Sequence, residues 1–423
     1  MAPAVSRPSQ DPSDAESTTD KPKRLRWIVL AGLWLIYSAF GMIATSLAPL
    51  VPEIMRDLDI GHTMMGAIFG AWQLVFIFAA IPCGALLDRI GVERGLLLGA
   101  LVIAVSAMLR GLATNELIMI LAMAVFGAGG PIVSTGAPKV VAQWFKGKER
   151  GLAMGIYITG PAIGSITALS LTNSVLMPLV GNDWRTVQWI WTAYALAAGV
   201  VWLMLTTRLA IGNGAAGSRA GEPQGYWSVV RDLLGIRTVR LIMIMSVGIF
   251  VINHGLNNWL PEILRAKNMS AAQAGYWAAL PTIVGLAGSL LIPRLATPQR
   301  RGFILMGLCV AALVATLLLQ ADPGGLLIGG LILQGIARSS LTTVAILTLV
   351  ETPQIGETRA ATASGMFFSA AEVGGASGPL MVGVMHATTG SFQPALGFLT
   401  GVAGLLLIGA YQLHAARRTP ANV

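Results

Sequence analysis

The word Pro52-Glu53-Ile54-Met55-Arg56 returns almost unchanged as Pro261-Glu262-Ile263-Leu264-Arg265, 209 residues later. The register continues beyond the word, because Gly66 and Gly275 each stand ten residues after its arginine. Similarity at one fixed spacing is typical of an internal duplication. In a chain rich in apolar residues, such a duplication indicates two related membrane units, an arrangement common among transporters.

The composition indicates a membrane protein. Of the 423 residues, 55% are hydrophobic and only 11% are charged, whereas a typical soluble domain carries about a quarter charged residues. An apolar stretch of about 20 residues is long enough to cross a bilayer as an α-helix. We expect twelve such spans, six before and six after a polar segment: 27–50, 62–87, 94–111, 116–144, 151–177, 186–207, 239–263, 271–292, 302–320, 323–349, 360–386 and 392–413.

The predicted fold class is an all-α integral membrane protein, with twelve transmembrane helices in two pseudo-symmetric halves of six. The N-terminal half should cover residues 27–208 and the C-terminal half residues 239–416. Residues 209–238 are rich in glycine and polar residues at their start. They should form a cytoplasmic linker, with a short surface helix around Tyr226 to Leu234.

The distribution of lysine and arginine predicts the orientation, because basic residues in short loops remain on the cytoplasmic side. Most basic residues fall in the loops that we assign to the cytoplasm. The segments assigned to the outside carry only Arg56, Arg110, Arg185, Arg265 and Lys267. We therefore expect a multi-pass protein of the bacterial inner membrane with both termini in the cytoplasm. Residues 1–26 should form a disordered tail and residues 417–423 a second tail. The net charge of +9 reflects this asymmetry and does not indicate nucleic-acid binding.

A dense charged motif lies between the second and third predicted spans. It reads G-x-L-x-D-R-x-G-x-x-R-x-L and consists of Gly84, Leu86, Asp88, Arg89, Gly91, Arg94 and Leu96. Its glycines permit close backbone approach and a tight turn. Its carboxylate can face the positive end of a neighbouring helix, and its arginines can form charge-assisted hydrogen bonds across the bundle. The motif suits a gate; the alternative is a plain turn that only sets topology.

This motif resembles the signature loop of the major facilitator superfamily, and with twelve spans and a central linker the resemblance covers nearly the whole chain. It implies a secondary transporter that works by alternating access. The loop would latch the two halves on the cytoplasmic side in the outward-open state. The segment Lys146 to Gly151 resembles the family's other charged loop, which implies that Glu149 and Arg150 act as cytoplasmic clasps.

The resemblance has one departure and one local refinement. Met123 occupies the place of the family's basic residue in the fourth span, which weakens an assignment as a simple drug–proton antiporter. The stretches 257–261 and 371–375 look most similar to the cyanate-permease-like branch of bacterial carriers.

Two opposite charges lie deep in the predicted membrane region, where ionisable residues are costly and usually functional. Arg338 and Glu372 stand roughly 17 and 18 Å from the cytoplasmic ends of the tenth and eleventh spans, at about 1.5 Å per residue. We predict that they form an intramembrane ion pair or both face the cavity. In the functional interpretation, Arg338 holds an anionic substrate and Glu372 takes up the coupling proton. The alternative is a structural pair that fixes helix packing.

Polar residues also gather in the seventh span, whereas the equivalent positions of the first span carry Ala44, Thr45, Ala48 and Pro49. Asn253, His254 and Asn257 are predicted to bind the substrate, and His254 could also exchange a proton near neutral pH. The alternative is that the amides hydrogen-bond to backbone groups freed by the proline that follows. Tyr37 and Gln73 are further substrate-binding candidates, because they lie near mid-membrane on helices that line the cavity in the resembled superfamily.

The predicted function is secondary active transport of a small solute, expected to be a small organic anion, coupled to protons. One alternative is an efflux antiporter for a neutral or cationic compound; another is a non-transporting sensor or scaffold with the same fold. We predict no enzyme, no cofactor and no metal, because the sequence shows no catalytic constellation or metal-ligand spacing. It also lacks a G-x-x-x-x-G-K-[ST] loop for ATP. The expected partners are the substrate, protons and the lipid bilayer, and a monomer should contain the complete pathway.

Overall fold

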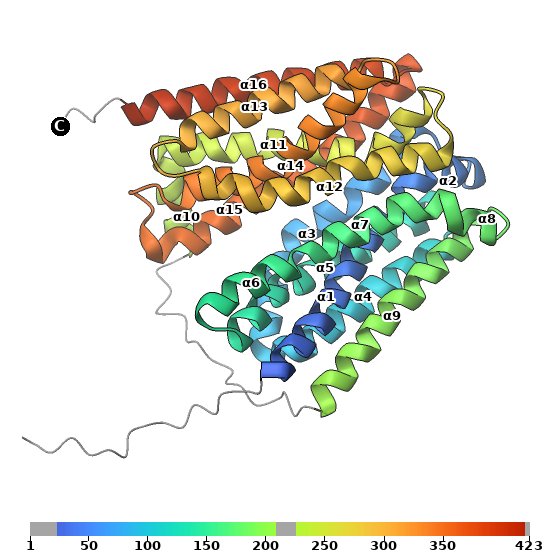
Figure 1. The fold of residues 1–423 in the computed structure, drawn as a ribbon, viewed down its shortest axis with the longest axis horizontal. Helices are drawn as coiled ribbons and strands as arrows, with labels where there is room; N and C mark the ends of the chain where they lie inside the picture. Colours follow the sequence, from blue (N-terminus) through green and yellow to red (C-terminus); the bar gives the residue numbers. More distant parts are fainter. Residues whose placement is uncertain (1–22, 209–225, 419–423) are drawn as a thin grey trace, which may run out of the picture.

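The computed structural model describes residues 23–208 and 226–418 (Figure 1). The first part contains α1 (Lys23–Thr45), α2 (Val51–Asp57), α3 (His62–Ile90), α4 (Val92–Gly111), α5 (Glu116–Trp144), α6 (Gly147–Tyr157), α7 (Thr159–Leu171), α8 (Met177–Leu179) and α9 (Trp184–Arg208). The second part contains α10 (Tyr226–Gly235), α11 (Arg237–Arg265), α12 (Ala271–Leu295), α13 (Arg301–Leu318), α14 (Gly325–Val350), α15 (Gly356–Thr389) and α16 (Gln393–Arg418). Residues 1–22 and 419–423 of the predicted tails, and residues 209–225 of the predicted linker, lie outside the described residues.

The all-α fold class is confirmed. Each of the twelve predicted spans coincides with helix in the described part of the chain, with ends that differ by five residues or fewer. Among the described residues, ten segments are long and apolar enough to cross a membrane by length and composition, and α12 and α15 are not among these ten. The fifth span consists of α6, α7, a π-helical segment and α8 in succession. The short helix expected after residue 225 is α10.

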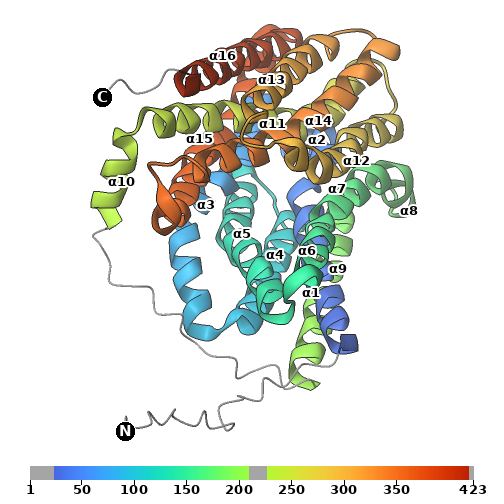
Figure 2. The ribbon, with the colours of Figure 1, turned by 60° about the vertical axis from the view of Figure 1, so that its left-hand side comes forward.

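The helices form two bundles, which separate α1–α9 from α11–α16 (Figures 1 and 2). The bundles meet at the end of the molecule that carries α2, which we call the α2 end. They diverge toward the opposite end, which carries α6 and α10 and which we call the α10 end. The space between the halves therefore widens toward the α10 end.

Glycines allow the two halves to touch through their backbones near the α2 end. A Cβ added at Gly66 of α3 would lie 2.6 Å from the carbonyl oxygen of Pro379 in α15. One added at Gly70 would lie 2.5 Å from the carbonyl oxygen of Ala376. No side chain fits such gaps, so α3 and α15 pack more closely than ordinary helices. This contact closes the α2 end.

The two copies of the repeated word differ in their backbone. In the second half the word ends the continuous helix α11, whereas in the first half α1 stops at Thr45 and the word lies in the separate helix α2. The fully buried Arg110 of α4 lies beside this break. Its Nη1 donates to the carbonyl oxygen of Ile43 at 2.6 Å and to Ser46 Oγ at 3.2 Å. The guanidinium thus satisfies a carbonyl group at the broken end of α1.

Candidate functional site

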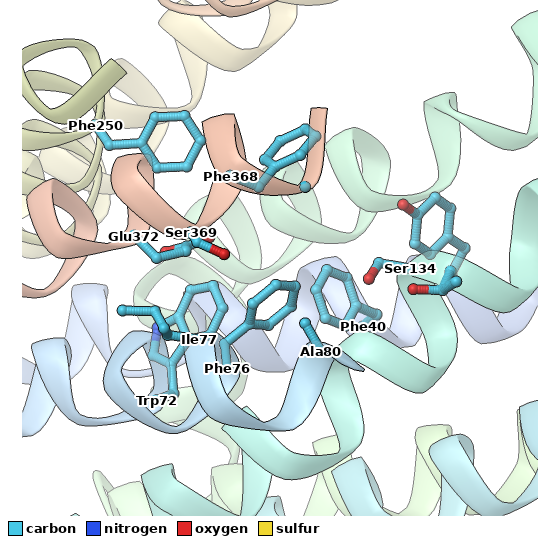
Figure 3. A pocket seen from close by; sticks show the side chains of 13 residues that line it. Phe40, Trp72, Phe76, Ile77, Ala80, Ser134, Phe250, Phe368, Ser369 and Glu372 are labelled. Carbon is cyan, nitrogen blue, oxygen red and sulfur yellow. The ribbon is translucent and has the colours of Figure 1, made fainter. Parts of the chain in front are cut away.

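A cavity of about 530 Å³ lies between the halves (Figure 3). Helices α1, α3 and α5 contribute Tyr37, Phe40, Trp72, Phe76, Ile77, Ala80, Ser134 and Thr135. Helices α11 and α15 contribute Phe250, Gly365, Phe368, Ser369 and Glu372. Along α15, Glu372 is the lining residue farthest from the α10 end, so it marks the inner end of the cavity.

Glu372 is a buried carboxylate whose surroundings leave it partly unsatisfied. The side chain is 5% exposed, and its Oε2 has no hydrogen-bond partner among the described residues. A Cβ added at Gly375, one turn further along α15, would lie 2.6 Å from this oxygen. Burial of a carboxylate without a partner is costly, and this oxygen therefore favours a proton or a cation.

Gln73 and His254 meet Glu372 at the same point. The added Cβ at Gly375 would also lie 3.1 Å from Gln73 Cγ and 3.3 Å from His254 Cδ2. Gln73 Nε2 and His254 Nδ1 are 3.2 Å apart and hydrogen-bonded, while Gln73 Oε1 is buried without a partner in the described structure. The structure thus brings together three residues predicted from the sequence. Gln73 comes from α3 of the first half, and His254 and Glu372 come from α11 and α15 of the second half.

Tyr37 of α1 lines the same cavity and packs among other aromatic rings. It stacks on Tyr157 of α6, with ring centroids 5.5 Å apart. It also stacks on Phe40 at 5.7 Å. Tyr37 is therefore positioned to touch a solute in the cavity.

Arg338 lies apart from the cavity lining. Its Nη1 is 3.4 Å from Thr282 Oγ1 of α12, and its backbone carbonyl accepts a hydrogen bond from Asn253 Nδ2 at 3.3 Å. Arg338 and Asn253 border a separate, very small void inside the second half. Among the ion pairs of the described residues, none joins Arg338 to Glu372. The prediction that Arg338 and Glu372 form an ion pair or both face the cavity is therefore wrong for this conformation, in which only Glu372 lines the cavity.

The physical reason is helix rotation. Arg338 and Glu372 stand at similar depths, but α14 packs mainly against α12 and α13, whereas α15 packs mainly against α11 and α3. Equal depth does not make two side chains face each other. The remaining predicted polar residue, Asn257, is half-buried on α11 and is not part of the cavity lining.

The charged loop after α3 makes its contact within one half. Lys139 Nζ of α5 is 2.7 Å from Asp88 Oδ1, and both side chains are substantially exposed. Gly91 has φ of +85°, a left-handed conformation that suits glycine at the turn between α3 and α4. At Gly84, no described atom lies within 4 Å of the position that a Cβ would take. Since the predicted latch belongs to the outward-open state, its role stays a prediction.

Other predicted gate residues lie near the same end. Arg89, Arg94 and Arg150 are exposed. Glu149 pairs with Arg26 of α1 at 3.7 Å, so this contact also stays within the first half. Neither of these described ion pairs joins the two halves at the α10 end.

Sequence reasoning missed an ion pair between the halves. Arg265 Nη1 lies 3.2 Å from Glu53 Oε1 at the α2 end, and both side chains are about four-fifths buried. The acid comes from the first copy of the repeated word and the arginine from the second. The repeat was therefore also a signal for this contact, because both copies of the word lie at the α2 end.

Comparison with known proteins gives a family and several relatives. A family model described as Major Facilitator Superfamily matches residues 33–379. The D-galactonate transporter of Escherichia coli O6:H1 is 24% identical, covering 92% of this chain and 95% of the relative. The 2-nitroimidazole transporter of Escherichia coli K12 is 26% identical, covering 93% of this chain and 96% of the relative. A crystal structure of a mutant of the nucleoside transporter NupG superposes with a TM-score of 0.77 at 15% identity. The match covers 92% of this chain and 99% of that structure's chain.

Proposed function

The chain belongs to the Major Facilitator Superfamily, and from this premise we propose that it moves a small organic solute by alternating access, with Glu372 carrying a coupling proton. It is a multi-pass membrane transporter and not an enzyme. With the predicted orientation, the α10 end faces the cytoplasm. The conformation is then inward-open, with the solute site reached from inside the cell.

The buried, unpartnered oxygen of Glu372 is the observation that carries the proposal. Ionisable groups inside a membrane bundle are retained at high cost and usually serve a pathway. Burial disfavours the charged form of a carboxyl group, so a proton on Glu372 removes the unfavourable charge. Loss of that proton requires water or a cation in the cavity, which links proton release to cavity access.

Gln73 offers a means of linking the proton to the movement of the halves. A protonated carboxyl group becomes a hydrogen-bond donor, and Gln73 Oε1 is an acceptor without a partner in the described structure. Gln73 belongs to the first half and Glu372 to the second. A hydrogen bond between them would therefore form and break as the halves approach and separate. His254 holds the Gln73 amide through its own hydrogen bond.

Two solute charges remain candidates. A small organic anion is the class expected from the sequence, and the name of the D-galactonate transporter supports it; this candidate requires Arg338 to reach the cavity in another conformation. The cavity favours the alternative, a neutral or cationic solute, because Glu372 is the only charged residue among the described residues that line it. Each chain contains one complete cavity, so we expect a monomer to transport.

Solute-driven proton flux in liposomes tests the role of Glu372. A pH-sensitive dye inside the vesicles would follow proton movement after addition of tartrate, cyanate, benzoate, benzamide or benzylamine. At least one solute should drive more proton flux with the wild type than in vesicles without protein, where only the uncharged acid or amine crosses the lipid, and Glu372→Gln should abolish this difference. Glu116→Gln, which changes a partly exposed acid in the first turn of α5, is the matched control and should behave as the wild type.

Two results would contradict the proposal. Solute flux that is independent of pH and unchanged in Glu372→Gln would remove the proton role. Absence of flux for every solute, with folded protein in the vesicles, would favour a sensor or scaffold instead.

A further inference from the structure

We infer that the solute is a flat aromatic molecule, neutral or cationic, which enters between two rows of aromatic rings. This inference rests on the proposed function, because a transported solute must occupy the cavity between the halves. It goes further by naming the chemical class that the cavity recognises.

The two rows belong to different halves. Phe40, Trp72 and Phe76 lie along one side of the cavity, and Phe250 and Phe368 lie along the other (Figure 3). Within the first row the Trp72 and Phe76 rings are 6.0 Å apart at 80°. Within the second, the Phe250 and Phe368 rings are 6.5 Å apart at 72°. The edge-to-face contacts within each row fix the ring orientations and leave ring surface toward the cavity.

The facing rows present apolar surface that the described residues leave uncovered in this conformation. Phe368 is 41% exposed, although it lies between the halves and lines the cavity. Aromatic rings gain free energy from burial of their surface, and a further contribution from offset-stacked or edge-to-face contact with another ring. A flat aromatic ring of the solute, inserted between the rows, would cover the ring surfaces of both rows. Closure of the α10 end would then bring the two rows together around the solute.

The polar groups of the cavity limit the solute further. Besides Glu372, the polar side-chain groups of the described lining are the indole N–H of Trp72 and the hydroxyls of Tyr37, Ser134, Thr135 and Ser369. A polyhydroxylated acid has more hydroxyls than this lining can pair, and each hydroxyl buried without a partner costs binding free energy. A carboxylate solute would also meet the negative faces of the rings and an acid. A cation is attracted by ring faces. The charge of the cavity lining and the arrangement of its rings therefore favour the same class of solute.

Binding to small matched probes tests this class directly. Saturation-transfer NMR on the purified protein would compare benzylamine with cyclohexylmethylamine, which has the same charge but no aromatic ring. Benzamide, benzoate and D-galactonate complete the set. Benzylamine and benzamide should bind, while cyclohexylmethylamine, benzoate and D-galactonate should bind at least about tenfold more weakly.

Two ring substitutions sharpen the test. Phe76→Leu and Phe368→Leu keep apolar volume but remove one ring from each row, and each should weaken benzylamine binding about three- to tenfold. The matched control is Phe78→Leu, because Phe78 lies on α3 beside Phe76 but is 77% exposed and does not line the cavity. It should bind benzylamine like the wild type. Elution as a single symmetric peak would verify that the variants are folded.

The outcomes separate this inference from the proposed function. The aromatic class is overturned if D-galactonate or benzoate binds more tightly than benzylamine, if cyclohexylmethylamine binds equally well, or if Phe78→Leu is as damaging as Phe76→Leu. If anions then drive proton flux that depends on Glu372, the transport proposal stands without the aromatic class. If aromatic probes bind as expected but no solute moves protons, the aromatic class stands and proton coupling fails.

Discussion

Single residues decide the chemistry of the cavity, and Gly375 shows how little space is left around the acid. The three nearest atoms to its missing Cβ belong to Glu372, Gln73 and His254. These residues come from three helices that are far apart in the sequence. A glycine at this position is what lets them converge.

Gly375→Ala should therefore uncouple transport. The added methyl group would displace the Glu372 carboxylate and Gln73, and such displacements at a working site reduce rates about tenfold or more. Solute-driven proton flux in liposomes would measure the loss. Gly404→Ala in α16 serves as control, since nothing described lies within 4 Å of that Cβ position, and it should transport normally. Unchanged coupling in Gly375→Ala would show that the three side chains do not act together.

At the scale of elements, the broken end of α1 depends on a residue from another helix. Arg110 lies at a span end by sequence, where an arginine ordinarily reaches water. The structure instead buries it completely, over the ring of Phe126 at 5.3 Å and against the carbonyl oxygen of Ile43. Its position holds α4 to the break between α1 and α2.

We expect Arg110→Met to destabilise the protein by about 1–3 kcal/mol, because the Ile43 carbonyl would lose a charged donor inside the bundle. The midpoint of thermal unfolding in detergent should fall relative to the wild type. Arg94→Met, which changes an exposed arginine at the other end of α4, should leave the midpoint nearly unchanged. If the midpoint of Arg110→Met equals that of the wild type, the break between α1 and α2 does not depend on Arg110.

At the scale of the whole molecule, the conformation depends on which end holds the halves together. The α2 end has glycine-mediated contacts between α3 and α15 and the ion pair between Glu53 and Arg265. At the α10 end, the described ion pairs of Asp88 and Glu149 stay within the first half. The α2 end is therefore the closed end, which corresponds to an inward-open state in the orientation proposed above.

Removal of the ion pair between the halves should favour opening of the α2 end. For Arg265→Gln we expect a shift of about two- to fivefold toward open molecules, the scale of a partly exposed ion pair. Distances between spin labels on Thr63→Cys and Ser270→Cys, both exposed at this end, would report the populations. The native Cys83 and Cys309 are buried. Arg56→Gln, the equivalent arginine of the first copy, is exposed and should not shift the distances; a matching shift would refute the role of the pair.

The sequence by itself determined the spans, the duplication and the family, because apolar length, fixed spacing and a compact loop motif are local properties of the chain. It also indicated Glu372, Gln73 and His254, since polar groups stand out against apolar helices. Only the tertiary structure decided that these three meet while Arg338 does not, because depth along a helix leaves its rotation open. The same reason hid the aromatic rows: Phe76 lines the cavity and Phe78 does not, yet in an apolar sequence the two positions look alike.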